Sequence, residues 1–334
     1  MTPGCPCPDS GNDVTTPPQT DPPLCQLPSE RRRWRPGQTL GLPLFVASIL
    51  CSLAFSAHAE VQPALKKPVS SRKAGLSIRI DGSDWGGVRR EEIETLLYAV
   101  ADELLTQVPR KLSVPIVVSP TRGNPVVLYE RGLGGEYRVQ LHATGPRWHL
   151  YAYEFAHELC HILSNYDENA GADVTRYNQW FEEALCETAS LYVLRSLAAR
   201  WEHEAPSPEW AIRASGFRLF AERLVSEGHR RLPSDQRLAH WLLDHEERLR
   251  KDPYLREKNE LVANLLLPLF ERYPGGWQAV GYLNRGGLQA TASFEEYLAA
   301  WYAAAPMEHR RFIGDVLGLL GVPVGLGGQL ARAP

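Results

Sequence analysis

Residues 153–161, YEFAHELCH, decide how the rest of the chain is interpreted. They place His157 and His161 four positions apart, with Glu158 directly after the first histidine. The surrounding run from Pro146 to about residue 165 has no internal proline or glycine, which favours a helix with proline in its first turn. Positions i and i+4 of a helix share a face, so both imidazoles can reach one metal ion. We therefore expect His157 and His161 to bind a metal, with Glu158 beside it as general base.

A second run supplies the expected third ligand. Residues 180–187 read WFEEALCE and place Glu183 and Glu187 four positions apart on a helix from about 178 to 201. Their flanks are largely apolar, which indicates a buried helix, and buried acidic side chains need partners. We expect Glu183 to bind the metal, because Glu187 then lies one turn on and can accept a hydrogen bond from the outer nitrogen of a bound histidine. Glu182 lacks an acidic residue four positions later and is not the expected ligand.

Together, H-E-x-x-H on one helix and W-F-E-E-x-x-x-E on the next resemble the motifs of the gluzincins, the thermolysin and aminopeptidase clan of zinc peptidases. The resemblance covers residues 75–201. It implies a Zn²⁺ site with a glutamate as third ligand, a second acidic residue behind it, and an edge strand, here 136–142, that binds extended substrate. Ala184 stands where many aminopeptidases have glycine, and the chain lacks their Gly-x-Met-Glu-Asn signature, which counts against aminopeptidase activity. Metzincins are excluded because position 167 is Asp instead of a third histidine.

The hydropathy pattern around these motifs predicts an α+β fold. A small mixed sheet is expected from strand patterns at 76–80, 114–118, 126–130 and 136–142, with one helix at 88–108. After residue 201 only helical patterns occur, at 208–227, 234–250, 254–272, 276–284, 293–304 and 308–319. We accordingly divide the chain into an N-terminal extension with signal peptide (1–59), a linker (60–74), a zincin-like catalytic core (75–201) and a helical subdomain (202–334).

The N-terminal region predicts export. The basic run RRRWR at 31–35 precedes an apolar stretch at 40–55 and the small residues of Ser56-Ala57-His58-Ala59, which predicts signal cleavage after Ala59. Thirty residues before the basic run are unusually many. Either the true start lies downstream of Met1, or the apolar stretch is an uncleaved anchor, and only the anchor would place the protein on a membrane. In both cases residues 60–334 lie outside the cytoplasm, in the periplasm or secreted.

Two functions remain open. The first is an exported zinc-dependent metallopeptidase, an endopeptidase acting on a peptide or protein substrate. The second is a non-catalytic exported domain that keeps zinc for stability or for binding a partner, and the intact Glu158 favours the first. Nucleic acid is not an expected partner, because the net charge is −3 and no basic stripe occurs outside the N-terminal run.

Other candidate residues carry weaker signals. Some gluzincins stabilise the transition state with a tyrosine or histidine from the helical half, and the sequence does not single out one of His229, Tyr282, Tyr302 and His309. The acidic loop 167–173 lacks the ligand series of a calcium loop and is expected to be a plain connection. Cys160 and Cys186, the cysteines that remain after cleavage, form either a disulfide or two separate buried thiols, and neither lies on the face expected to bind the metal.

Overall fold

The computed structural model describes residues 75–105, 112, 114–169, 178–285 and 292–323. All of them belong to one compact unit, Ala57–Pro334. The basic run, the apolar stretch and the expected cleavage site lie outside the described residues, as does part of the acidic loop. Among the helices that are described, none combines the length and the apolar character needed to cross a bilayer.

The sheet is small and mixed, as predicted. It comprises β1 (Ile78–Ile80), β2 (Ile116–Pro120), β3 (Val126–Val127) and β4 (Tyr137–Leu141). The order is β1-β2-β4-β3, with β1, β2 and β4 parallel and β3 antiparallel to β4. Along β4 buried residues alternate with more exposed ones, as expected for a strand with one face on the core.

The edge strand differs from the expected one. Residues 136–142 were expected to border the cleft, but β4 lies inside the sheet, between β2 and β3. The chain returns after β3 through the turn at 128–136, so that Val127 pairs with Val139 and β3 takes the edge position. The sequence pattern could not tell which of the two strands lies at the edge, because both segments are short and strand order in a sheet is a tertiary property.

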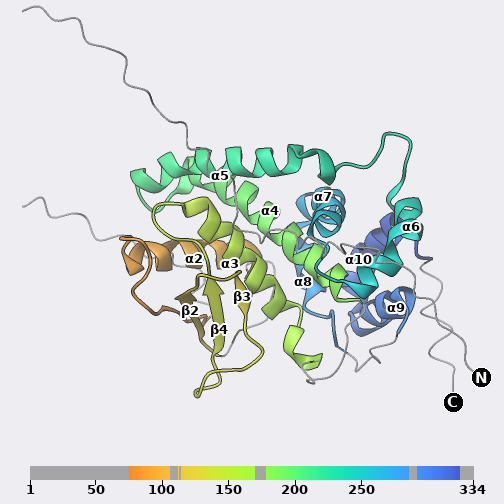
Figure 1. Ribbon diagram of the computed structural model, residues 1–334, viewed down its shortest axis with the longest axis horizontal. Coiled ribbons are helices and arrows are strands. Elements are labelled where there is room, and N and C mark those ends of the chain that lie inside the picture. The colour runs from red at the N-terminus through yellow and green to blue at the C-terminus, as the bar shows by residue number, and fades with distance from the viewer. Residues whose placement is uncertain (1–74, 106–111, 113, 170–177, 286–291, 324–334) are drawn as a thin grey trace, which may run out of the picture. The chain divides into compact units, whose positions relative to one another are not determined.

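The helices follow the predicted pattern closely. Helix α2 (Arg90–Leu105) packs on β1 and on α3 (Trp148–Leu163), and α4 (Gln179–Glu204) packs against α3, α5 and α7 (Figure 1). The remaining elements are η1 (Tyr166–Asn169), α5 (Pro208–Ser226), η2 (Gly228–Arg230), α6 (Leu238–Lys251), α7 (Arg256–Arg272), η3 (Pro274–Gly276), α8 (Trp277–Val280), α9 (Phe294–Ala304) and α10 (Met307–Leu320). The helix expected at 276–284 is shorter, because the chain turns at Gly281 and reaches a left-handed conformation at Asn284. The α+β prediction with a helical C-terminal half is thus confirmed.

Helix α4 lies at the centre of this unit. Every residue from Trp180 to Leu194 is buried, apart from the partly exposed Glu183. A helix that is enclosed on all sides belongs to the interior of a domain, and it carries its polar side chains into that interior. The polar residues of α4 therefore need partners from the elements packed around it.

Glu154, in the middle of α3, connects this helix to the end of β4. Its Oε2 accepts hydrogen bonds from the backbone N–H groups of His142 and Ala143, both at 2.9 Å. Burial raises the pKa of Glu154 to about 7, although the two N–H donors oppose this shift. The carboxyl group is thus the buried hydrogen-bond acceptor for the two backbone N–H groups that directly follow β4.

We expect Glu154→Gln to preserve the fold and Glu154→Ala to lower the free energy of unfolding by about 2–4 kcal/mol. The amide oxygen of Gln can accept both bonds, whereas Ala leaves two buried N–H groups without an acceptor. The folded-state pKa of about 7 exceeds the ordinary 4.5, so the folded protein holds the proton more tightly between these pH values. Wild-type stability relative to Glu154→Gln should therefore fall as the pH rises through that window. Denaturant titrations at both ends of the window measure it, and a pH-independent difference would contradict the assignment.

Candidate metal centre

Helices α3 and α4 bring the three expected ligands together. Oε2 of Glu183 lies 3.3 Å from Nε2 of His157 and 3.7 Å from Nε2 of His161. In a tetrahedral zinc site with bonds of about 2.0–2.1 Å, neighbouring ligand atoms are roughly 3.3 Å apart. The side chains of His157 and Glu183 remain 17% and 14% exposed. Oε2 of Glu183 therefore lies near the Nε2 atoms of both histidines, these donor types are ones that metal ions accept, and solvent reaches part of the cluster.

The charges around the two imidazoles also favour a cation. Glu158, Glu182 and Glu183 surround them, and Glu158 and Glu182 are only 4% and 3% exposed. Burial acts to lower the pKa of His161, but the attraction of Glu183 and the hydrogen bond to Glu182 outweigh it and raise that pKa to about 10. Burial acts to raise the pKa of Glu183, and the charge of His161 with the hydrogen bond from His157 lowers it overall. A divalent cation would balance the carboxylates that crowd this buried position.

Glu158 lies between the histidines and the edge strand. Burial raises the pKa of its carboxyl group, while His157, His161 and the backbone N–H of Val127 act in the opposite direction. Val127 belongs to β3, so the expected general base lies beside the edge of the sheet. An elevated pKa brings a carboxylate closer to the range in which it exchanges protons at neutral pH.

Glu182 makes an outer contact to His161 that the sequence did not predict. Its Oε1 lies 2.7 Å from Nδ1 of His161 and 3.0 Å from the Ser164 hydroxyl, and its Oε2 accepts a 2.7 Å hydrogen bond from Asn284. A carboxylate on Nδ1 fixes the ring so that Nε2 is available to a metal. Sequence reasoning passed over Glu182 because its partners are distant in the chain, and spacing along α4 gives no sign of them.

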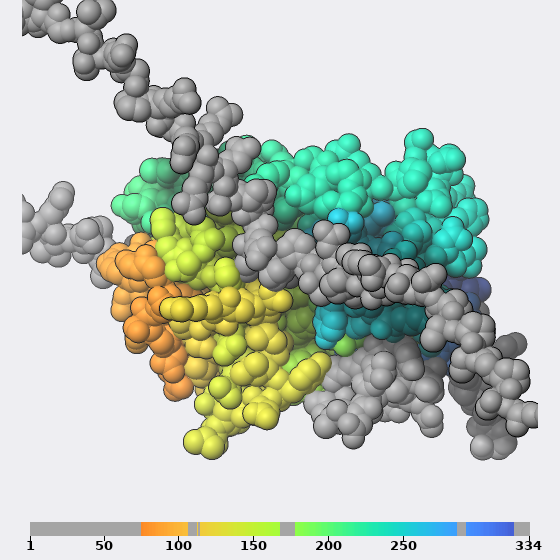
Figure 2. Space-filling model, viewed as in Figure 1, coloured from red at the N-terminus to blue at the C-terminus, as the bar shows by residue number. Residues whose placement is uncertain are grey.

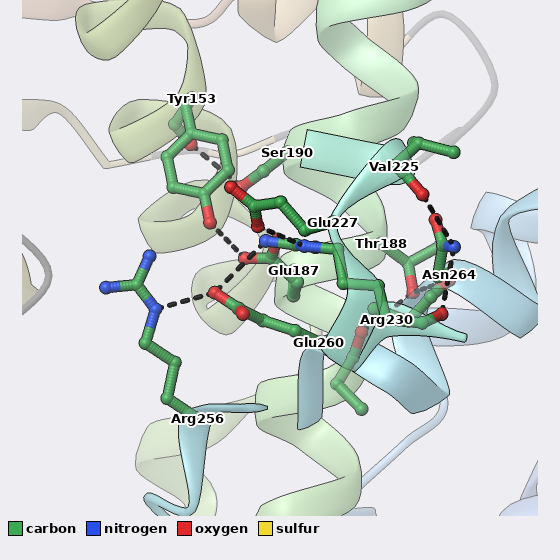
Figure 3. Close-up of polar contacts among 12 residues, drawn as sticks. Tyr153, Glu187, Thr188, Ser190, Val225, Glu227, Arg230, Arg256, Glu260 and Asn264 are labelled. Atoms are coloured by element: carbon green, nitrogen blue, oxygen red, sulfur yellow. Dashed lines mark hydrogen bonds and ion pairs between the residues drawn. The ribbon is translucent and has the colours of Figure 1, made fainter. Parts of the chain in front are cut away.

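Glu187 is held by Tyr153 and Arg230, and His157 also lies close enough for its charge to lower the pKa of Glu187. The hydroxyl of Tyr153 donates to its carboxylate, and a guanidinium nitrogen of Arg230 donates to it at 2.8 Å (Figure 3). Burial acts to raise the pKa of Glu187, but the charge of Arg230 outweighs it and holds that pKa below its usual range. Glu187 therefore ties the ligand-bearing helix to η2.

The Arg230 cluster extends across the helical half. Arg230 is fully buried and faces Glu227 at 3.1 Å and Glu260 at 3.0 Å in addition to Glu187. Glu260 also pairs with Arg256 at 2.6 Å. Side-chain atoms of Glu227, His229 and Glu260 lie within 4.8 Å of one another, as in a metal site. Because guanidinium groups already neutralise both carboxylates, ion pairing accounts for this arrangement without a metal.

The two cysteines lie side by side as buried, free thiols. Burial raises the pKa of the Cys186 thiol, and the neighbouring Cys160 thiol adds to the shift. Contrary to the expectation that neither thiol lies near the metal-binding face, Sγ of Cys186 and ring nitrogens of His157 and His161 all lie within 4.8 Å of one another. Cys186 is therefore a further donor within reach of the centre.

The candidates for stabilising a transition state contact other residues. His229 is hydrogen-bonded to Glu260 at 2.5 Å. The rings of Tyr282 and His309 are 5.6 Å apart, and the Tyr302 ring faces Arg310. Among the hydrogen bonds and ring contacts of the described residues, none joins these four side chains to the metal centre.

No model of a known protein family matches the chain, and no curated protein matches it either.

We expect Arg230→Met to lower the free energy of unfolding by about 3–5 kcal/mol, because it leaves Glu187 buried without its cation. The double variant Glu187→Gln, Arg230→Met should lose less of the free energy of unfolding, because the buried negative charge of Glu187 is then removed together with its cation. Arg256→Met is the matched control: its side chain is 40% exposed, so the loss should be smaller. Chemical denaturation measures all three. Equal losses in the single and double variants would show that the charge on Glu187 does not depend on Arg230.

Proposed function

We propose that this chain is an exported zinc-dependent metallopeptidase of the gluzincin type that cleaves within peptides or proteins. The observation that carries the proposal is the convergence of His157, His161 and Glu183 with a buried glutamate directly after the first histidine. His157, His161 and Glu183 would hold Zn²⁺. Export rests on the basic run, apolar stretch and small residues that end at Ala59.

The chain's own groups suit peptide hydrolysis. When bound, Zn²⁺ would supply a Lewis acid and a water of lowered pKa. Glu158 would be the base that accepts a proton from such a water, and its raised pKa supports that role. Glu182 holds Nδ1 of His161 and leaves Nε2 free. These roles match an acid–base site with an accessible metal more closely than a closed structural one.

The position of β3 at the edge of the sheet is consistent with an extended peptide substrate. β3 has β4 on one side, and an edge strand can pair with an added peptide strand on the other. Because Val127 of β3 lies beside Glu158, a peptide paired to this edge would run past the base. This geometry favours cleavage within a chain over recognition of a free amino terminus, in keeping with the missing aminopeptidase signature.

We expect Glu158→Gln to retain zinc and lose at least two orders of magnitude in the rate of hydrolysis, because a general base contributes about that much. His157→Ala should lose the metal itself. Zinc content and cleavage of an unstructured protein substrate, with and without a chelator, measure the two effects separately. Equal zinc loss in both variants would show that Glu158 has a structural task.

Cys186 favours a second candidate, the non-catalytic zinc-binding domain. With two histidines, Glu183 and a thiolate, the metal would have four protein ligands, which is the arrangement of structural zinc sites. Such a site leaves no position for water. The two candidate functions therefore differ in whether the fourth metal ligand is water or the Cys186 thiolate.

Cobalt substitution distinguishes these candidates. We expect Co²⁺-loaded protein to lack a thiolate charge-transfer band, and Cys186→Ser to bind the metal as tightly as wild type, because the proposed peptidase site keeps one position open. A band in the wild type that disappears in Cys186→Ser would overturn the peptidase proposal in favour of the closed site. Cys160→Ser, which changes the neighbouring thiol, is the matched control.

A further inference from the structure

Glu182 is held by the helical half of the chain. Asn284, which follows α8, donates to Oε2 of Glu182 at 2.7 Å and to the backbone oxygen of Ser164 at 3.0 Å. The amide oxygen of Asn284 accepts a 2.8 Å hydrogen bond from the hydroxyl of Tyr297 on α9. A continuous chain of hydrogen bonds therefore runs from Tyr297 through Asn284 and Glu182 to His161.

A second asparagine makes a reciprocal contact. Asn165, just after α3, donates to the backbone oxygens of Gly281 at 3.0 Å and Leu283 at 2.8 Å. Asn165 and Asn284 both have φ of 61°, a left-handed conformation that asparagine adopts more readily than most residues. Each asparagine thus donates to the segment that carries the other, and we call this pair the asparagine clasp. It fixes segment 281–284 against the end of the helix that bears the histidines.

We propose that Asn284 is a positioning residue of the metal centre, acting through Glu182 on His161; this rests on the proposed zinc site. The amide of Asn284 restrains one carboxylate oxygen of Glu182 and the Ser164 hydroxyl restrains the other, so the carboxylate stays in line with Nδ1 of His161. A carboxylate held on Nδ1 fixes the ring orientation and keeps Nε2 available as a ligand.

The clasp itself supplies a matched pair of variants. Asn284→Gly and Asn165→Gly each delete an amide that donates two hydrogen bonds across the clasp, and glycine accepts the left-handed backbone in both. Asn284 donates one of its two bonds to Glu182, whereas the two bonds described for Asn165 go to backbone oxygens. If the clasp has a purely structural role, the two variants should change zinc affinity by similar amounts. If Asn284 positions Glu182, Asn284→Gly should lower zinc affinity more than Asn165→Gly.

The test measures zinc affinity by competition with a chromophoric chelator, together with unfolding of the metal-free proteins. We expect Asn284→Gly to weaken zinc binding 10- to 100-fold, the usual cost of losing a group that orients a metal ligand, and Asn165→Gly to weaken it less than about 3-fold. Glu182→Gln, which keeps the shape of the side chain, should weaken binding as much as Asn284→Gly. Tyr297→Phe should weaken it less, because it removes only the restraint on Asn284.

Equal zinc affinities in Asn284→Gly and Asn165→Gly would overturn the inference, whether both were lowered or both unchanged. If Asn284→Gly did not fold, Glu182→Gln and Tyr297→Phe would decide it, and wild-type affinity in both would overturn it. Failure of the wild type to bind zinc would instead refute the proposed function itself, so the two failures are distinguishable.

Discussion

The packing of α3 against α4 in a single register is the constraint on which the rest of the structure depends. Its contacts advance along α4 as they go back along α3: His161 meets Glu182, His157 meets Glu183, and Tyr153 meets Glu187. The hydroxyl of Ser190 then donates to the backbone oxygen of Tyr153. Sliding either helix by one turn would separate every pair at once and leave buried charges unpaired, which costs several kcal/mol for each ion. Polar contacts therefore specify the register, and apolar burial on both helices supplies the stability.

Each buried carboxylate of this helix pair is held by a different part of the fold. The loop after β4 holds Glu154, the loop after α8 holds Glu182, and η2 holds Glu187 through Arg230. Glu158 lies against β3. The long helical half thus does more than cover the core, since it provides the donors that keep acidic side chains in fixed orientations. A fragment ending after α4 would expose that helix and lose the partners of Glu182 and Glu187.

The sequence predicted what depends on local periodicity. The helix positions and the face shared by His157 and His161 follow from the 3.6-residue repeat, and the same repeat in α4 turns Glu183 toward that face. The outer contacts could not be predicted in this way. Glu182 and Glu187 are both acidic, both buried and on one helix, and the residues that hold them, Asn284 for Glu182 and Arg230 for Glu187, lie 102 and 43 residues away in the chain. The edge position of β3 and the proximity of Cys186 to the histidines are likewise tertiary outcomes that spacing does not encode.

The burial of Glu158 bears on the choice between a catalytic and a structural site. A carboxylate removed from water is costly unless it is paired, and burial raises the pKa of Glu158 despite two nearby histidines. In a structural zinc site, a buried carboxylate that does not bind the metal would not stabilise the site. Burying an apolar side chain at that position would cost less free energy. Costly ionisable groups of this kind are concentrated where proton transfer is needed. Under the proposed peptidase function, the partial exposure of His157 and Glu183 would give a reacting water access to Glu158, whereas a site closed by Cys186 would leave the burial of Glu158 unexplained.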